Sequence, residues 1–88
     1  MSDPILPIVH LNGTSRDELI DLRRNAMSAL HDALYFMAKM NPHGRDYYPV
    51  DGLYEQALAQ HAARVQAVES VYDSITEEAL ALQKGGRS

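Results

Sequence analysis

The chain has 88 residues, so it forms at most one domain, and a chain this short buries only about 60–65% of the surface that it exposes when unfolded. It contains no cysteine, which excludes disulfide bonds and thiolate metal sites, and its formal net charge of −4 argues against direct binding of nucleic acid through phosphate neutralisation. No stretch reaches the roughly 18 apolar residues of a membrane span, and Met1–Pro4 lacks the basic start of a signal peptide. We therefore expect a soluble intracellular protein.

Residues 1–14 are predicted to form an extended N-terminal arm. Pro4 and Pro7 lack a backbone N–H and fix φ, so a helix is disfavoured, and an edge strand over residues 8–11 is the regular structure that remains. An arm of this length reaches about 40 Å. Either it packs on its own helices, or it is exchanged with a neighbouring subunit or docked on a partner. The residues available for these contacts are Ile5, Leu6, Ile8, Val9, His10 and Leu11.

A turn and a helix start follow the arm. Asn-Gly is a strong turn signal, and Ser15 with Glu18 forms a capping box, with Thr14 and Asp17 as the alternative register. The free N–H groups of a first helical turn can bind an anion, but the two acidic residues already satisfy the helix dipole and repel a phosphate. We therefore favour capping over ligand binding here. The candidate contact residues of this segment are Asn12, Gly13, Thr14 and Ser15.

A first long helix is predicted over residues 15–41, because apolar residues recur there at steps of three and four. Asn41-Pro42 ends it, since the residue before proline avoids the α region. The apolar stripe comprises Leu19, Leu22, Ala26, Leu30, Ala33, Met37 and Met40, and it is widened by Ala29, Leu34 and Phe36 beyond what one partner helix covers.

The loop over residues 42–51 is longer than the usual connection between two packed helices. Arg45 offers bidentate contacts to a carboxylate or phosphate, and Tyr47 and Tyr48 offer stacking faces and hydroxyls, so the loop is a candidate site for a nucleotide or for the acidic tail of a partner. The candidate contact residues of the loop are Arg45, Asp46, Tyr47 and Tyr48. The alternative is a structural cap, in which Arg45 pairs with Asp46 or with a helix terminus. In either case we expect one tyrosine to pack and the other to be free.

A second long helix is predicted over residues 52–83, with Asp51 as its N-cap and the glycine-rich residues 84–88 ending it in a flexible tail from residue 85. Alternating steps of four and three mark a heptad seam, which predicts near-parallel packing with a left-handed twist. His61 on this seam is interpreted as a packed polar residue, a register or pH element, or a metal ligand, although no HxxxH or ExxH pair accompanies it. The seam comprises Tyr54, Leu58, His61, Val65, Val68, Tyr72, Ile75, Ala79 and Leu82.

The expected fold is therefore all-α: an antiparallel, coiled-coil-like two-helix hairpin over residues 15–84 with an extended N-terminal arm, completed by oligomerisation. Two helices cover only part of each apolar stripe, so Leu34, Phe36 and Val71 must meet the arm, a second hairpin or another protein. No nucleophile–base pair, glycine-rich phosphate loop or paired carboxylates indicate an enzyme, and no metal or cofactor is expected.

The segment His10-Leu11-Asn12-Gly13-Thr14-Ser15, followed by a long helix and by Pro42-His43-Gly44-Arg45-Asp46-Tyr47-Tyr48-Pro49, resembles a group of short proteins encoded by tailed bacteriophages and prophages. The resemblance implies a place in the virion or the host cytoplasm, and it carries over no functional residue. Small phage proteins of this kind are commonly virion or assembly components, or modulators of host systems. Three hypotheses follow: a homo-oligomeric structural or assembly protein that packs with other phage proteins, a protein that captures a small anionic ligand such as a nucleotide signal, and an adaptor that inhibits a host protein. We favour the first.

Overall fold

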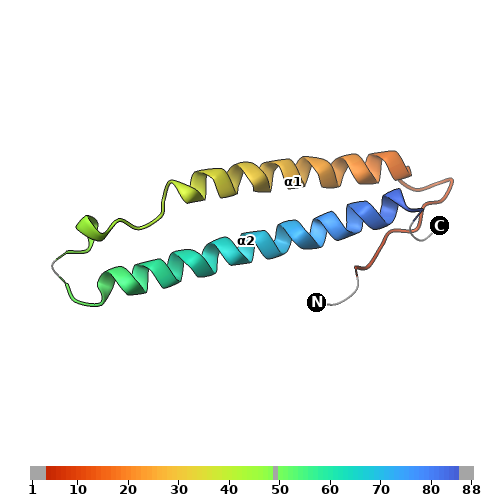
Figure 1. Cartoon of the computed structure of the whole chain (residues 1–88). Helices are drawn as coiled ribbons and strands as arrows, with labels where there is room; N and C mark the ends of the chain where they lie inside the picture. Colours follow the sequence, from red (N-terminus) through yellow and green to blue (C-terminus); the bar gives the residue numbers. More distant parts are fainter. Residues whose placement is uncertain (1–3, 49, 86–88) are drawn as a thin grey trace.

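The computed structural model describes residues 4–48 and 50–85 and shows an antiparallel hairpin of two helices (Figure 1). Helix α1 spans Arg16–Ala38, helix α2 spans Leu53–Gln83, and the connection holds one short 3-10 helix, η1, over Gly44–Asp46. The molecule measures 63 × 23 × 18 Å, and its radius of gyration is 18.5 Å, compared with about 12 Å for a compact domain of this length. The predicted hairpin with an extended N-terminal arm is confirmed.

Helix α1 starts at the predicted cap and ends earlier than predicted. The Ser15 Oγ accepts a hydrogen bond from the Glu18 backbone N–H at 3.2 Å, so the Ser15 register forms and the Thr14 register does not. The predicted end at residue 41 is wrong. The N–H groups of residues 39–41 donate to carbonyls three residues back, which tightens the last turn into 3-10 geometry before Pro42.

Helix α2 begins after a glycine in the left-handed conformation. Gly52 is the N-cap residue, with φ of 81°, and no side chain caps the helix, so the prediction of Asp51 as N-cap is wrong. A residue without Cβ takes this conformation at little cost, which explains why glycine rather than aspartate occupies the position. The C-terminal end is as predicted, because α2 ends at Gln83 and Gly85 has φ of 104°. Residues 86–88 of the predicted tail lie outside the described residues.

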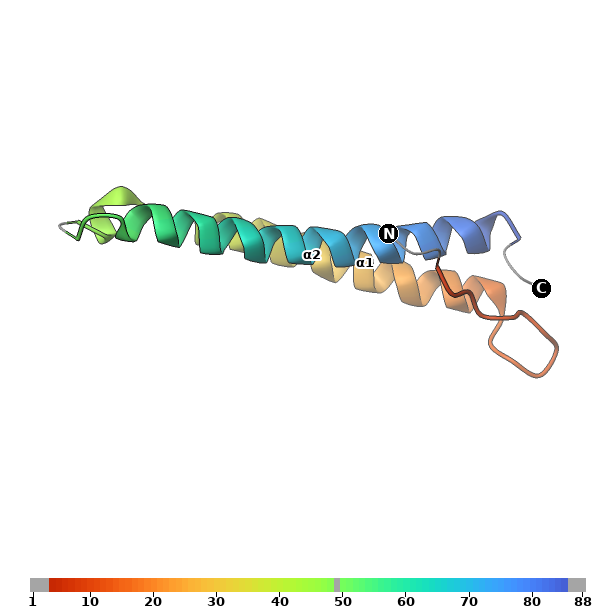
Figure 2. The same cartoon turned by 90° about the horizontal axis from the view of Figure 1, so that it is seen from below.

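The two helices meet along matching seams and cross at a shallow angle (Figure 2). Every predicted seam position of α2 is buried or half-buried. On α1 a row of buried and half-buried residues follows the same alternating steps, with the buried Ile20 and the half-buried Met27 and Leu34 beside it, but the row differs from the predicted stripe. It passes through Arg23 instead of Leu22, which is 60% exposed, and the predicted Met40 lies exposed beyond the helix end. The α1 seam comprises Arg16, Leu19, Arg23, Ala26, Leu30, Ala33 and Met37.

The arginine takes this seam position because its polar end is satisfied there. Arg23 Nε donates to Glu78 Oε1 at 3.0 Å and Arg23 Nη1 donates to the Leu19 carbonyl at 3.1 Å, while its aliphatic stem lies in the seam. Steps of three and four both continue the row from Leu19, so apolar spacing alone favoured Leu22.

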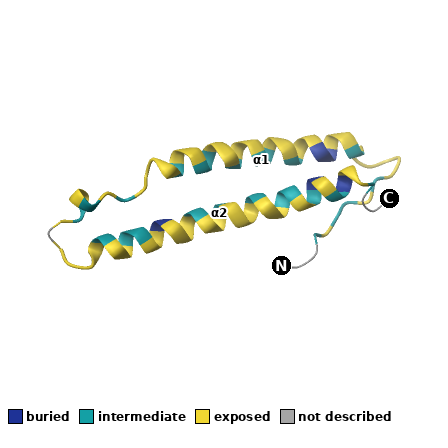
Figure 3. Cartoon of the chain, in the orientation of Figure 1, coloured by how far each residue is buried: buried dark blue, intermediate teal, exposed yellow. Residues whose placement is uncertain are grey.

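The apolar core is confined to the end of the hairpin that carries both termini, which we call the open end. Leu19, Ile20 and Leu82 form one cluster there, and Val9 of the arm packs on it. Toward the loop, His61 is the one buried residue among those described (Figure 3). Isolated helix pairs with so thin a core are marginal.

The arm is extended without forming a strand over residues 8–11. Only Ile8 has bridge geometry, and the element order among the described residues contains helices alone. Neither α1 nor α2 combines the length and the apolar character that a membrane crossing requires.

Candidate interaction surfaces

The loop between the helices is a chain of tight turns. The Arg45 backbone N–H donates to His43 Nδ1 at 3.4 Å, and the Asp46 N–H donates to the His43 carbonyl at 3.0 Å, so His43 opens the η1 turn. Further bonds run from the Val50 N–H to the Tyr47 carbonyl and from the Leu53 N–H to the Val50 carbonyl, each at 3.3 Å. The backbone of the loop is therefore held by its own hydrogen bonds.

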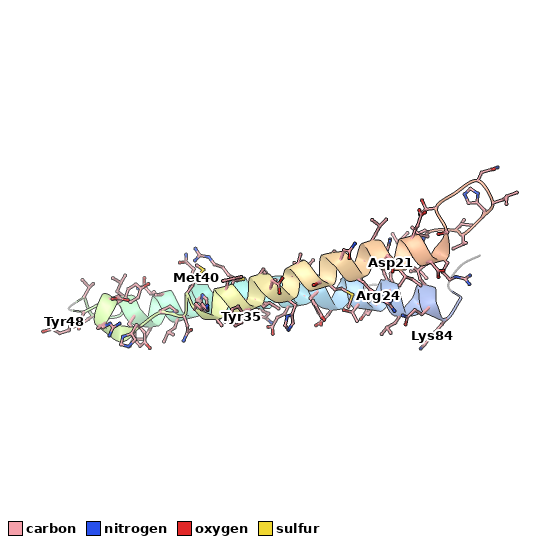
Figure 4. All side chains as sticks on the ribbon, turned by 90° about the horizontal axis from the view of Figure 1, so that it is seen from above. Asp21, Arg24, Tyr35, Met40, Tyr48 and Lys84 are labelled. Atoms are coloured by element: carbon pink, nitrogen blue, oxygen red, sulfur yellow. The ribbon has the colours of Figure 1, made fainter. Side chains whose placement is uncertain are left out.

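The two adjacent tyrosines separate, as expected. Tyr47 is half-buried, and its ring lies 6.2 Å from that of Tyr54 at an angle of 34°. Gly44 faces the same Tyr54 ring, which a Cβ at residue 44 would meet at 3.9 Å. Tyr48 is 83% exposed and projects from the tip (Figure 4). Tyr47 therefore belongs to a structural cap, and Tyr48 is available to a partner.

The charged residues of the loop do not pair as the cap interpretation required. Arg45 and Asp46 are both exposed, and Arg45 makes no ion pair or side-chain hydrogen bond with any described residue. The predicted pairing of Arg45 with Asp46 or with a helix terminus is therefore absent from the described part of the chain. The loop therefore presents an exposed guanidinium at residue 45 and an exposed ring at residue 48.

The second predicted contact segment, residues 12–15, lies at the open end and is occupied by its own structure. The Gly13 N–H donates to the His10 carbonyl at 3.1 Å, and the His10 ring lies against Gly13 so closely that a Cβ there would meet Nε2 at 2.7 Å. Ser15 caps the helix, and Asp17 and Glu18 place negative charge at the first turn. This arrangement disfavours an anion at the start of α1.

The two predicted contact segments lie at opposite ends of the molecule (Figure 4). Helix α1 has 23 residues and separates them by about 35 Å. Within one chain they cannot hold the same small ligand.

Two arginines that were not part of the predicted apolar stripe lie in the α1 seam of the structure. Besides Arg23, Arg16 is half-buried and its Nη2 donates to the Gly85 carbonyl at 3.0 Å, which satisfies a free carbonyl at the end of α2. Its Nε is buried without a partner among the described residues. A signal was present in the sequence, because the steps of the α1 seam continue back from Leu19 to Arg16.

One lateral flank of the hairpin carries shallow grooves. One, of about 660 Å³, opens beside His61 where the end of α1 passes α2, and a second of about 490 Å³ shares Glu69 with it. No group of three His, Asp or Glu residues that could hold a metal ion is found in the described ranges. His61 therefore forms part of a mainly apolar groove wall. The larger groove is lined by Ala38, Asn41, Leu58, His61, Ala62, Val65 and Glu69.

The opposite flank is more exposed and apolar, and we call it the valine face. Its residues each precede a seam position. The residues that follow the two seams share the grooved flank, as Ile20 with Gln83 and Leu34 with Glu69 show, so the two rows that precede the seams lie together on the other side of the antiparallel pair. Leu22 and Phe36 are each 60% exposed and Val71 is 49% exposed. The valine face is defined by Leu22, Ala29 and Phe36 of α1 and by Arg64, Val71 and Glu78 of α2.

No family model matches the chain, and the searches of curated proteins and of solved structures also find no match. The surface chemistry of the hairpin is therefore what bears on its function.

Proposed function

We propose that the chain is a non-enzymatic structural or assembly subunit that works by packing its helices and arm against other protein chains. Its resemblance to short proteins of tailed phages suggests that these chains are further copies of itself and other phage proteins, in the virion or in the host cytoplasm.

The observation that carries the proposal is the excess of exposed surface. The chain exposes 6649 Å², whereas a compact monomer of its mass exposes about 5,200 Å². The excess of about 1,500 Å² exceeds the roughly 800 Å² that each partner buries in a standard protein interface. Much of it is apolar, and apolar surface exposed in this way marks sites of protein association.

The arm supports the same proposal. Val9 packs on the open-end core, but Ile5 and Leu11 on either side of it are almost fully exposed. Two large apolar side chains held out on an extended, proline-containing segment suit contact with a neighbouring chain.

Capture of a small anion at the loop is the alternative function. The exposed guanidinium of Arg45 and the exposed ring of Tyr48 favour it, because a nucleotide takes both a phosphate contact and a stacking face. The same features also suit the surface of a host protein, so an inhibitory adaptor is the third candidate function.

Native mass spectrometry of the full chain, purified from the cells that naturally produce it, distinguishes these functions. An oligomer that carries no added small-molecule mass supports the assembly subunit. A monomer at every concentration contradicts it. An oligomer with the extra mass of a nucleotide per subunit favours the loop, and Arg45→Ala with Tyr48→Ala should then abolish the rise in melting temperature that the nucleotide causes.

The role of the arm is tested with a paired substitution. Ile5→Asp with Leu11→Asp should reduce assembly without lowering helix content, because both side chains are exposed. Ser28→Asp with Ala63→Asp, at exposed positions on the outer surfaces of the two helices, is the matched control. Equal assembly in the arm variant, the control and the original chain would exclude the arm as a contact.

A further inference from the structure

We propose that a second copy of this chain docks on the valine face in antiparallel orientation, forming a four-helix dimer with a twofold axis beside Ala29 and Val71. The inference rests on the proposed function and names the first partner of the subunit. In this dimer α1 packs on α1 of the other copy and α2 packs on α2, so that all neighbouring helices run antiparallel.

The α1 row of the valine face is symmetric in size about its centre. Leu22 lies two helical turns before Ala29 and Phe36 lies two turns after it, and both large side chains are 60% exposed. A twofold axis at Ala29 therefore brings Leu22 of one copy onto Phe36 of the other, twice, and leaves the small residue at the centre where the helices approach most closely.

The α2 row is complementary in charge about its centre. Arg64 lies two turns before Val71 and Glu78 lies two turns after it, so the same axis places each Arg64 against the Glu78 of the other copy. The Arg23–Glu78 bond uses Oε1, and the Glu78 side chain keeps 25% of its exposure, so the carboxylate is open to a second cation.

The outer edge of α1 repeats the pattern. Glu18 and Lys39 flank Ala29 at nearly equal distances along the chain, so the antiparallel arrangement pairs them as well. Lys39 lies 5.4 Å from the centre of the Phe36 ring, on the side chain that the second copy would cover. If the two hairpins were instead parallel, Glu18 and Glu78 of both copies would gather at one end, and the repulsion would oppose association.

The area fits a dimer. The surface excess of about 1,500 Å² per chain is sufficient for an interface that takes about 800 Å² from each partner. It leaves the arm and the grooved flank for the further contacts of the assembly proposed above. Val71, which is 49% exposed on a helix of the isolated chain, becomes covered at the axis.

A disulfide test locates the axis, because the chain contains no cysteine. Val71→Cys should form a covalent dimer under mild oxidation, since residues on a twofold axis meet their own copies. Ala63→Cys, an exposed position on the outer surface of the same helix, is the control and should remain mostly uncrosslinked. Equal crosslinking of the two variants would overturn the proposal.

A charge cycle tests the orientation by sedimentation equilibrium. Glu18→Lys and Lys39→Glu should each raise the dimer dissociation constant roughly 2- to 30-fold, because each creates two like-charged contacts, and the combined variant should restore it. Ala29→Glu should raise it at least about 100-fold by burying unpaired carboxylates at the axis. Unchanged dissociation in Ala29→Glu would also overturn the proposal. Circular dichroism of this variant should be unchanged, because Ala29 is exposed in the single chain.

The outcomes separate this inference from the proposed function. An oligomer that survives Ala29→Glu and does not crosslink through Val71→Cys would mean that another surface mediates assembly. That result would refute the proposed dimer and leave the proposed function as an assembly subunit intact. A chain that is monomeric at every concentration would refute both the proposed dimer and the proposed function.

Discussion

Replacing Leu82 by alanine should destabilise the hairpin more than any other single truncation of a leucine. Leu82 is 0% exposed and belongs to the cluster that joins α1, α2 and the arm. Removing a buried leucine side chain costs about 2–5 kcal/mol, and the end of a thin hairpin can partly collapse around the cavity, so we expect about 2–3 kcal/mol. For a domain of this size that corresponds to a fall in melting temperature of about 10–20 °C.

Leu80→Ala is the matched control, because it makes the same chemical change on the same helix. Leu80 is 50% exposed, and it lies off both the seam and the valine face, so its truncation should cost about 1 kcal/mol or less. The two differ in burial and not in helix propensity, which makes their difference the contribution of the core.

The measurement is urea unfolding followed by far-UV circular dichroism at two or more protein concentrations, since association adds concentration-dependent stability. A native chain of 88 residues has about 4–13 kcal/mol to lose, so the expected cost for Leu82 is readily resolved. Equal losses for Leu82→Ala and Leu80→Ala would refute the assignment of the core to the open end.

The remaining predictions use the same unfolding assay. Ser15→Ala should cost about 1 kcal/mol, while Thr14→Ala should change little, and the reverse order would restore the other capping register. Gly52→Ala should cost about 1–2 kcal/mol, because φ of 81° strains a residue with a Cβ, whereas Asp51→Ala should have no measurable effect. Arg23→Met should change stability by less than about 1 kcal/mol, since the partly solvated ion pair is replaced by an apolar side chain in the same seam; a loss of several kcal/mol would show that the pair holds the open end together.

The sequence predicts the fold because the types and spacing of its residues indicate two heptad-like rows and two helix ends. The seam of α2 follows from apolar spacing alone, since at nearly every position along it the alternative residue is polar or small. The seam of α1 does not, because Leu22 and Arg23 both continue the row from Leu19 and hydrophobicity favours the wrong one. Choosing Arg23 requires knowing that Glu78 stands opposite, which is a property of the folded pair.

The candidate sites are predictable only in part for the same reason. Because Tyr47 and Tyr48 are adjacent, the sequence predicts that one packs and the other is exposed, and the prolines and glycine of the loop predict the turn. That Arg45 stays unpaired among the described residues depends on how the loop turns, and spacing does not encode it. The symmetry of the valine face is present in the spacing of its residues along the sequence. It can be recognised only once the structure shows which residues of each helix remain exposed.

The position of the core at the open end has a consequence for how the hairpin forms. Its most stabilising contact joins residues 19 and 82, which are near the two extremes of the helical segment, while the turn that brings the helices together encloses no buried apolar residue among those described. Closure of the longest loop must therefore precede the greatest gain in energy, so folding should be slower than for a helix pair that zips up from its turn. By the same reasoning the turn connects the two helices but contributes little to holding them together. A chain cleaved within the turn should therefore persist as two helices that stay associated at the open end.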